Sequence, residues 1–301
     1  MDLHTQITLF LDYCHRQGLS PHTKRAYQGD LAEFLRWSGR KKTKALGRSS
    51  LESWLSEMRR RNYAPATIKR KLATLRAALG WLKRMRYLTD NPFQDFNPTI
   101  KFPQKLPRAL SRTELRALFR QAEEDAANFP NLARQTMRLA LELLFATGLR
   151  VGELCAVRLQ SIDLDGGVIR VNGKGSRERQ VYVVDQDTIA LLRQYLRDHA
   201  ANSQGTDCLL LTNRGTAATP DFIRRSLHEL ARRARLDRRV TPHMLRHSAA
   251  TQLLEQGVDI RYVQRLLGHS SISTTEIYTH VSNASLKASL MRADHRRHLD
   301  A

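Results

Sequence analysis

A proline-rich stretch about one third of the way along the chain does most to limit the possible folds. It reads TDNPFQDFNPTIKFPQKLPRALS. Its four prolines are Pro92, Pro98, Pro103 and Pro107. Each proline disfavours helix and pushes the residue before it towards an extended conformation. The sequence therefore predicts an interdomain linker at 91–108, between a domain at 1–90 and a second domain at 109–301.

The segment before the linker has the pattern of four helices. Apolar residues recur at helical spacing in the first helix, and Gly18 closes it. Ser20 followed by Pro21 is a strong start signal for the second helix, because Ser caps and Pro is favoured at the first helical position. Two more helices are expected from about Ser50 and about Pro65, and no strand pattern interrupts the four.

The charge of the chain is unusually basic. Lys and Arg number 50 against 29 Asp and Glu, which gives a net charge of +21. Residues 1–105 hold 21 basic and 8 acidic residues, so their net charge is +13, and the remainder carries +8. A solubilising surface usually gives a small domain a net charge of only about 2 to 8. The excess therefore predicts a polyanionic partner, because Lys and Arg displace the counterions condensed on phosphate backbones.

The segment after the linker has a mixed pattern. Ser111 and Glu114 form a capping box that opens a helix, and another helix ends at Gly148. Residues 167–184 alternate apolar and polar positions around NGKGS, which predicts a β-hairpin. Further helices are expected near Asp187, at Pro220, at Pro242, over 259–267 and over 271–280. The chain is therefore expected to be mainly α with a small antiparallel β-sheet.

Cysteine usage and hydropathy bear on the compartment. Cys14, Cys155 and Cys208 are odd in number and too scattered for metal-ligand spacing, which fits a reducing compartment. The N-terminal stretch has early acidic residues and no uninterrupted apolar run, unlike a signal peptide or a membrane span. We expect a cytoplasmic protein with no membrane partner.

Two motifs place arginines where they could bind phosphate. In TPHMLRH, Thr241 caps a helix on which His243 and Arg246 share one face, close to an N-terminus that favours anions. In TGLRVGEL, Arg150 lies between two helices, and two forked guanidinium groups can hold both non-bridging oxygens of a phosphodiester. The alternatives are a solvent-facing His243 and Arg246, and an Arg150 paired with Glu153.

Three more residues could take part in phosphate chemistry. Lys174 lies in the hairpin turn between two glycines, where it is either solvated or placed to give a proton to a leaving oxygen. His269, in GHSS, could donate a hydrogen bond to a phosphoryl oxygen. Tyr278 is nine residues further on. Only about one free tyrosine in a thousand is ionised at pH 7, so Tyr278 is either a packing residue or a nucleophile assisted by cations and a base.

Together these motifs resemble the tyrosine recombinases, the phage-integrase-like site-specific recombinases, and among them the Xer-like proteins. The matching residues are Arg150, Lys174, His243, Arg246, His269 and Tyr278. Their order, spacing and context match the family, and the resemblance covers nearly the whole chain. It implies an N-terminal four-helix core-binding (SAM-like) domain and a tyrosine recombinase catalytic domain that form a C-shaped DNA clamp.

The resemblance also implies a role for each site residue. Tyr278 would attack a DNA phosphodiester and form a 3′-phosphotyrosyl bond, while the two arginines hold the phosphate. His269 would donate to the phosphate, His243 would accept the tyrosyl proton, and Lys174 would protonate the departing 5′-oxygen. No ATP, metal or other cofactor is expected, and the sequence has neither a P-loop nor an acidic cluster suited to Mg²⁺.

The expected partner is double-stranded DNA with specific, inverted-repeat-like sites. By resemblance, four protomers of this chain, or of this chain and a paralogue, would act on two paired sites, and the tail after about residue 282 would contact a neighbouring protomer. Chromosome dimer resolution and mobile-element recombination are both open. The alternatives are a type IB topoisomerase, which uses a similar residue set, and a non-catalytic DNA-binding regulator on the same scaffold.

Overall fold

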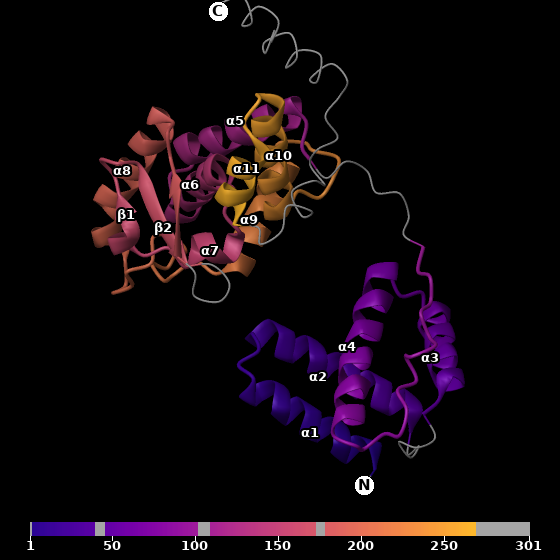
Figure 1. The fold of residues 1–301 in the computed structure, drawn as a ribbon. Coiled ribbons are helices and arrows are strands. Elements are labelled where there is room, and N and C mark those ends of the chain that lie inside the picture. The colour runs from indigo at the N-terminus through magenta and orange to yellow at the C-terminus, as the bar shows by residue number, and fades with distance from the viewer. Residues whose placement is uncertain (1, 40–45, 102–108, 173–177, 269–301) are drawn as a thin grey trace, which may run out of the picture. The chain divides into compact units, whose positions relative to one another are not determined.

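The chain forms two compact units in a computed structural model, Met1–Lys105 and Leu106–Ala301. The structure describes residues 2–39, 46–101, 109–172 and 178–268 (Figure 1). Each unit has its own hydrophobic core.

The first unit is built from four helices. They are α1 Leu3–Arg16, α2 Pro21–Ser38, α3 Arg48–Arg60 and α4 Pro65–Arg84. The predicted start of α2 is confirmed, because the Ser20 hydroxyl accepts the backbone N–H of Thr23 at 3.1 Å. Helices α1, α2 and α4 pack on one another, and Trp54 of α3 lies edge-on to the ring of Phe34. Phe93, from the segment predicted to be a linker, is also buried in this core.

The second unit combines helices with one small sheet. Its helices are α5 Arg112–Asn128, α6 Leu132–Thr147, α7 Val151–Cys155, α8 Gln186–Asn202, α9 Pro220–Arg233, α10 Pro242–Glu255 and α11 Ile260–Leu267, with a 3₁₀ turn η2 at Leu159–Ser161. Its strands are β1 Ile162–Asp163, β2 Val168–Asn172 and β3 Glu178–Tyr182. The predicted capping box of Ser111 and Glu114 is confirmed, as is the left-handed Gly148 after α6. The helix expected over 271–280 lies outside the described residues.

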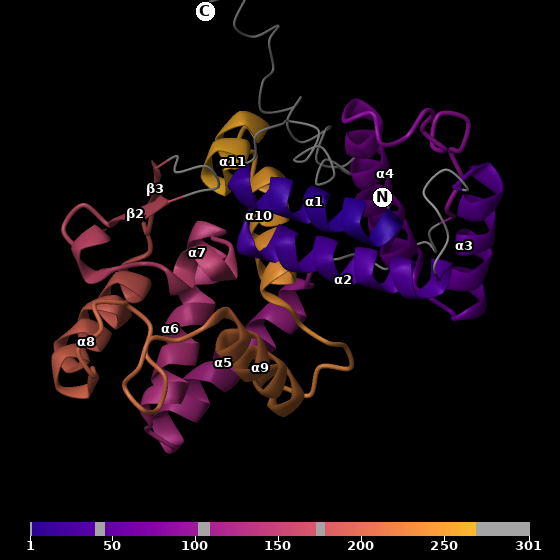
Figure 2. The same cartoon turned by 90° about the horizontal axis from the view of Figure 1, so that it is seen from below.

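Helix α6 is central to the second unit. It packs against α5, α8, α9 and α10, which surround it in Figure 2, and Leu139, Leu143 and Leu144 are fully buried along it. The strands lie in the order β1-β2-β3 and pair antiparallel, which confirms the predicted hairpin for β2 and β3. Within the described ranges, no helix combines the length and the apolar composition needed to cross a membrane. The well-packed α6 fixes the position of the turn that follows it.

The buried helix α6 also carries a carboxyl group that should make stability depend on pH. Burial raises the pKa of Glu142 to about 7; Arg138 opposes this shift, and Asp185 and Glu123 reinforce it. The native state therefore holds a proton that the unfolded chain, with an ordinary pKa of 4.5, releases. The stability from this proton is complete below about pH 4.5 and is lost as the pH rises through about 7. Glu142→Gln should raise the free energy of unfolding by roughly 1–2 kcal/mol above about pH 7 and should leave it unchanged near about pH 4.5. The expected gain is smaller than the full pKa shift implies, because a half-buried group retains some contact with water. Thermal unfolding across this range tests the difference, and a pH-independent gain would contradict it.

Candidate active site

A buried arginine on α10 joins two distant turns of the chain. The cap provided by Thr241 starts α10 so that His243 and Arg246 fall in its first turns. The Arg246 side chain is buried, at 2% exposure; its Nη1 donates to the Gly148 carbonyl oxygen and its Nη2 to that of Leu267, each at 2.6 Å. The solvent-facing alternative is therefore wrong for Arg246, whereas His243 is exposed.

The two carbonyl groups that Arg246 binds lie at two helix ends. Gly148 caps α6 and Gly268 caps α11, both in the left-handed conformation. A Cβ atom on Gly148 would lie only 2.7 Å from Cδ2 of Leu267, so the absence of a side chain allows the two ends to meet. Arg246 thus connects the turn that leads into Arg150 with the end of α11.

Arg150 lies at the N-cap of α7 and pairs with Glu153, as one of the two interpretations of the sequence predicts. Its Nη1 lies 2.9 Å from Oε1 of Glu153, and its backbone N–H donates to Oε2 at 2.8 Å. The Arg150 side chain is nevertheless 47% exposed, against 9% for Glu153. The carboxylate therefore orients a guanidinium group that still has access to solvent and to a ligand.

Arg179 is a part of the site that sequence reasoning missed. From β3 it donates Nη1 to Oε1 of Glu153 at 3.0 Å and Nη2 to Oε2 at 2.8 Å. Burial raises the pKa of Glu153, but hydrogen bonds from Arg179 and from Arg150 outweigh burial and hold the pKa below its usual value. The sequence does contain one signal for this role. Arg179 lies two residues before buried Val181, so the two side chains point to the same, inward face of the strand. A charged side chain on that face needs a partner.

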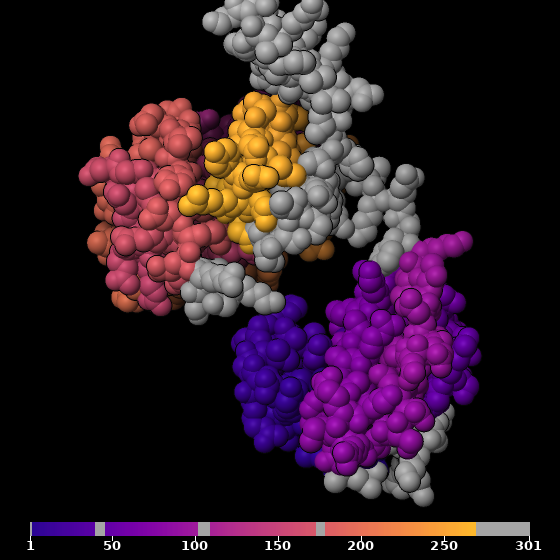
Figure 3. All heavy atoms as spheres, viewed as in Figure 1, coloured from indigo at the N-terminus to yellow at the C-terminus, as the bar shows by residue number. Residues whose placement is uncertain are grey.

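A cavity of about 680 Å³ adjoins Arg179 between the sheet and the α10–α11 pair. In Figure 3, α11, in yellow, lies beside the sheet on one face of the second unit. The cavity is lined in part by Tyr182, Leu253, Val258 and Tyr262, and neither Arg150 nor Arg246 lines it. The two candidate phosphate-binding arginines therefore lie outside this cavity.

The remaining predicted site residues, Lys174, His269 and Tyr278, lie outside the described residues. Chain connectivity places Lys174 between β2 and β3, and His269 directly after the Gly268 cap. Among residues that the structure describes, no three His, Cys, Asp or Glu side chains are grouped so that they could hold a metal ion. The described part of the site is thus cationic, with Glu153 as its internal counter-charge.

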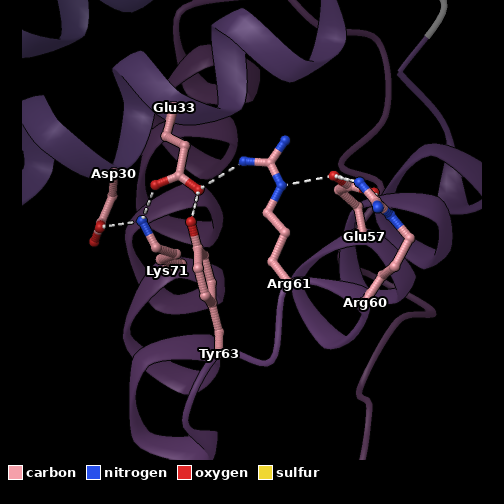
Figure 4. Close-up of polar contacts among 7 residues, drawn as sticks. All are labelled: Asp30, Glu33, Glu57, Arg60, Arg61, Tyr63 and Lys71. Atoms are coloured by element: carbon pink, nitrogen blue, oxygen red, sulfur yellow. Dashed lines mark hydrogen bonds and ion pairs between the residues drawn. The ribbon is translucent and has the colours of Figure 1, made fainter.

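A buried ionic network links α2 and α4 in the basic first unit (Figure 4). Lys71, at 6% exposure, donates to Oδ1 of Asp30 at 3.0 Å and to Oε2 of Glu33 at 2.7 Å. The Tyr63 hydroxyl and Arg61 Nη1 donate to the other Glu33 oxygen at 2.5 and 3.4 Å. Burial lowers the pKa of Lys71, but its bonds to Glu33 and Asp30 outweigh burial and raise the pKa. Lys71 therefore stays charged and joins α2 to the basic helix α4.

Lys71→Met should destabilise the first unit by about 1–3 kcal/mol, because Asp30 and Glu33 lose their shared cation, while Asp30 keeps its ion pair with Arg70 and Glu33 its contact with Arg61. The chain has three tryptophans, at 37, 54 and 81, all within the first unit, so tryptophan fluorescence during urea denaturation reports on that unit alone. The matched control is Lys83→Met on the exposed face of α4, which should change stability by less than about 0.5 kcal/mol. Equal losses in the two variants would contradict the expectation.

Comparison with known proteins defines the class of protein. Residues 102–285 match the phage integrase family, and residues 7–86 match the N-terminal SAM-like domain of phage integrases. The chain therefore belongs to the phage integrase family, the tyrosine recombinases, and the predicted family, mainly helical fold and small antiparallel sheet are confirmed.

Individual relatives extend over nearly the whole chain. A tyrosine recombinase of Agathobacter rectalis is 32% identical over 303 residues, covering 98% of each chain. The tyrosine recombinase XerC of Listeria innocua is 35% identical over 297 residues, covering 94% of this chain and 95% of the relative. The integrase of the transposon Tn1549, solved in complex with a circular intermediate DNA, is 19% identical with a TM-score of 0.79 and covers 95% of this chain and 99% of its own. Because the identity is only 19%, the similarity to the Tn1549 integrase shows a shared fold alone.

Proposed function

We propose that this chain is a site-specific recombinase that cuts and rejoins DNA through a 3′-phosphotyrosyl intermediate on Tyr278. The observation that carries the proposal is the bridge made by Arg246 between the carbonyl oxygens of Gly148 and Leu267. The bridge draws together the α10 arginine, the turn that carries Arg150 and the helix end from which the segment with His269 and Tyr278 continues.

The charges of the site suit a phosphodiester. Arg150 and Arg246 would bind the non-bridging oxygens and stabilise the additional negative charge of the pentacovalent transition state, with His269 as a further donor. A phenol is a weak nucleophile at neutral pH because its pKa is about 10. His243, exposed near the start of α10, would accept the Tyr278 proton as the oxygen attacks.

The proposed reaction conserves the phosphodiester bond. The Tyr278 oxygen forms a bond to phosphorus while the bond to the 5′-oxygen breaks; the electron pair stays on that oxygen, which takes a proton from Lys174. In the reverse sense, the 5′-hydroxyl of a second strand attacks the phosphotyrosine and releases Tyr278. Exchange of one pair of strands forms a Holliday junction, and exchange of the second pair resolves it. Since no bond energy is lost, the cycle needs no ATP.

The partner that fits this chemistry is double-stranded DNA with inverted-repeat-like sites, bound by both units. The net charge of +13 over residues 1–105 supports a phosphate-binding role for the first unit. We propose a tetramer on two paired sites, formed by this chain alone or with a paralogue, in the cytoplasm. Resolution of chromosome dimers and recombination of a mobile element both fit this activity.

A nicked suicide duplex tests the function. Footprinting first defines the bound site. A duplex nicked beside the cleavage phosphate then releases the short fragment that carries the free 5′-hydroxyl, so that the covalent intermediate cannot be rejoined and accumulates. We expect a detergent-resistant protein–DNA adduct whose DNA is attached to the peptide that contains Tyr278. Relaxation of plasmids without any specific site would instead support the topoisomerase alternative, and failure to trap an adduct on a bound site would support the regulator.

A further inference from the structure

We propose that Arg179 is a positioning residue for strand cleavage, which orients Arg150 through Glu153 and also fixes the end of α11. The inference rests on the proposed function, because it assigns Arg150 to the scissile phosphate. Arg179 itself would touch neither the DNA nor the tyrosine.

The hydrogen bonds around Glu153 form a symmetric arrangement. Its Oε1 accepts from Arg179 Nη1 at 3.0 Å and from Arg150 Nη1 at 2.9 Å. Its Oε2 accepts from Arg179 Nη2 and from the Arg150 backbone N–H, each at 2.8 Å. Each carboxylate oxygen therefore carries one bond from each arginine. The carboxylate cannot turn without breaking bonds to both, so the bidentate contact from Arg179 fixes the direction in which Glu153 meets Arg150.

Arg179 and Glu153 are mostly buried, whereas Arg150, the residue that they orient, is exposed. The Arg179 side chain is 15% exposed and that of Glu153 is 9% exposed, whereas Arg150 is 47% exposed. Two arginines balance one carboxylate, so the trio keeps one positive charge for an incoming phosphate. Without Arg179, Glu153 would have Arg150 as its one remaining cation in this trio and would draw that guanidinium away from the phosphate.

Arg179 also contacts the end of α11. Its Nε donates to the Leu266 carbonyl oxygen at 3.4 Å. A Cβ atom on Gly268 would lie 3.0 Å from both Cζ and Nε of Arg179, so the glycine backbone packs directly on the guanidinium. One side chain on the strand after the Lys174 turn thus holds both the support of Arg150 and the residue before His269.

Single-turnover cleavage of the nicked duplex tests the positioning role. Arg179→Gln should lower the rate at saturating DNA by about 10- to 100-fold, because small misplacements of a catalytic group have effects of this size. The half-saturating DNA concentration should stay within about twofold. Arg170→Gln, which removes the same charge from an exposed position on β2, is the matched control and should retain the wild-type rate. A higher half-saturating concentration with an unchanged rate would overturn the proposal.

A second substitution separates positioning from general damage. Glu153→Gln in the Arg179→Gln background removes the carboxylate that pulls on Arg150, so the double variant should cleave at least as fast as Arg179→Gln alone. The single variant Glu153→Gln is measured alongside. A double variant whose loss of rate equals the product of the losses in Arg179→Gln and Glu153→Gln would overturn the proposal.

Hydrogen exchange, which does not depend on activity, distinguishes a failure of the positioning role of Arg179 from a failure of the proposed recombinase function. The backbone amide of Arg150, which donates to Glu153, should exchange hydrogen about tenfold faster in Arg179→Gln and at the wild-type rate in Arg170→Gln. Unchanged exchange would overturn the positioning role. A wild-type protein with a protected Arg150 amide that never forms a DNA adduct would overturn the proposed function instead.

Discussion

Tyr278→Phe should bind its DNA site as tightly as the wild type and should form no covalent adduct. The substitution removes one oxygen atom, keeps the ring and leaves the net charge at neutral pH unchanged. Loss of a nucleophile typically lowers the rate by about 10⁴-fold or more, because neighbouring groups bind the phosphate but cannot replace the attacking atom. Mobility shift measures binding, and a denaturing gel of the nicked duplex measures the adduct.

The chain offers a matched control for this loss. Tyr262 is 69% exposed on α11, so Tyr262→Phe removes a phenolic oxygen without affecting the core and should form the adduct at the wild-type rate. An adduct that persists in Tyr278→Phe would identify another nucleophile and would refute the proposed role. Loss of DNA binding in Tyr278→Phe would indicate that the hydroxyl group serves binding rather than cleavage, because the ring is retained.

Arg246→Lys should reduce both cleavage and the stability of the second unit. A single ammonium group cannot reproduce the fork that reaches the carbonyl oxygens of Gly148 and Leu267, each 2.6 Å from Arg246. A buried carbonyl left without its donor costs about 1–3 kcal/mol. Because the ammonium group would be held by neither carbonyl oxygen in the same geometry, it would be displaced from the phosphate, and the cleavage rate should fall by about 10²- to 10³-fold.

Two controls isolate the effect of Arg246. Arg261→Lys makes the same exchange at an exposed position on α11 and should change neither the cleavage rate nor stability. Tryptophan fluorescence, which reports on the first unit, should show the same transition in Arg246→Lys as in the wild type, while calorimetry shows the loss in the second unit. If Arg246→Lys cleaved DNA at the wild-type rate, Arg246 would not be a residue of the active site.

Much of the helical framework was predictable because its signals are local. The cap of Ser20, the capping box of Ser111 with Glu114 and the left-handed Gly148 each depend on residues within four positions, and the structure contains all three. The β2–β3 hairpin was predictable for the same reason, because alternation on both sides of a glycine-containing turn sets its register.

The contacts that assemble the site were not predictable from local patterns. Arg246 meets the Gly148 carbonyl across 98 positions, and Arg179 meets Glu153 across 26. Strand phase shows that Arg179 points inward, but it does not reveal which carboxylate it meets. The Arg150–Glu153 pair was foreseen as an alternative to a phosphate-binding arginine, although the pair and an exposed guanidinium coexist. The roles of Lys174, His269 and Tyr278 remain predictions.

The close approach of Gly148 to Leu267 limits how this sequence can diverge. Any larger residue at 148 would face both a positive φ of 61° and a side-chain atom 2.7 Å from its Cβ. A shorter side chain at 267 removes the second obstacle and leaves the first, so the change tolerated best at 148 is an asparagine paired with a smaller residue at 267. We therefore expect substitutions at the two positions to be coupled, although 118 residues separate them in the sequence.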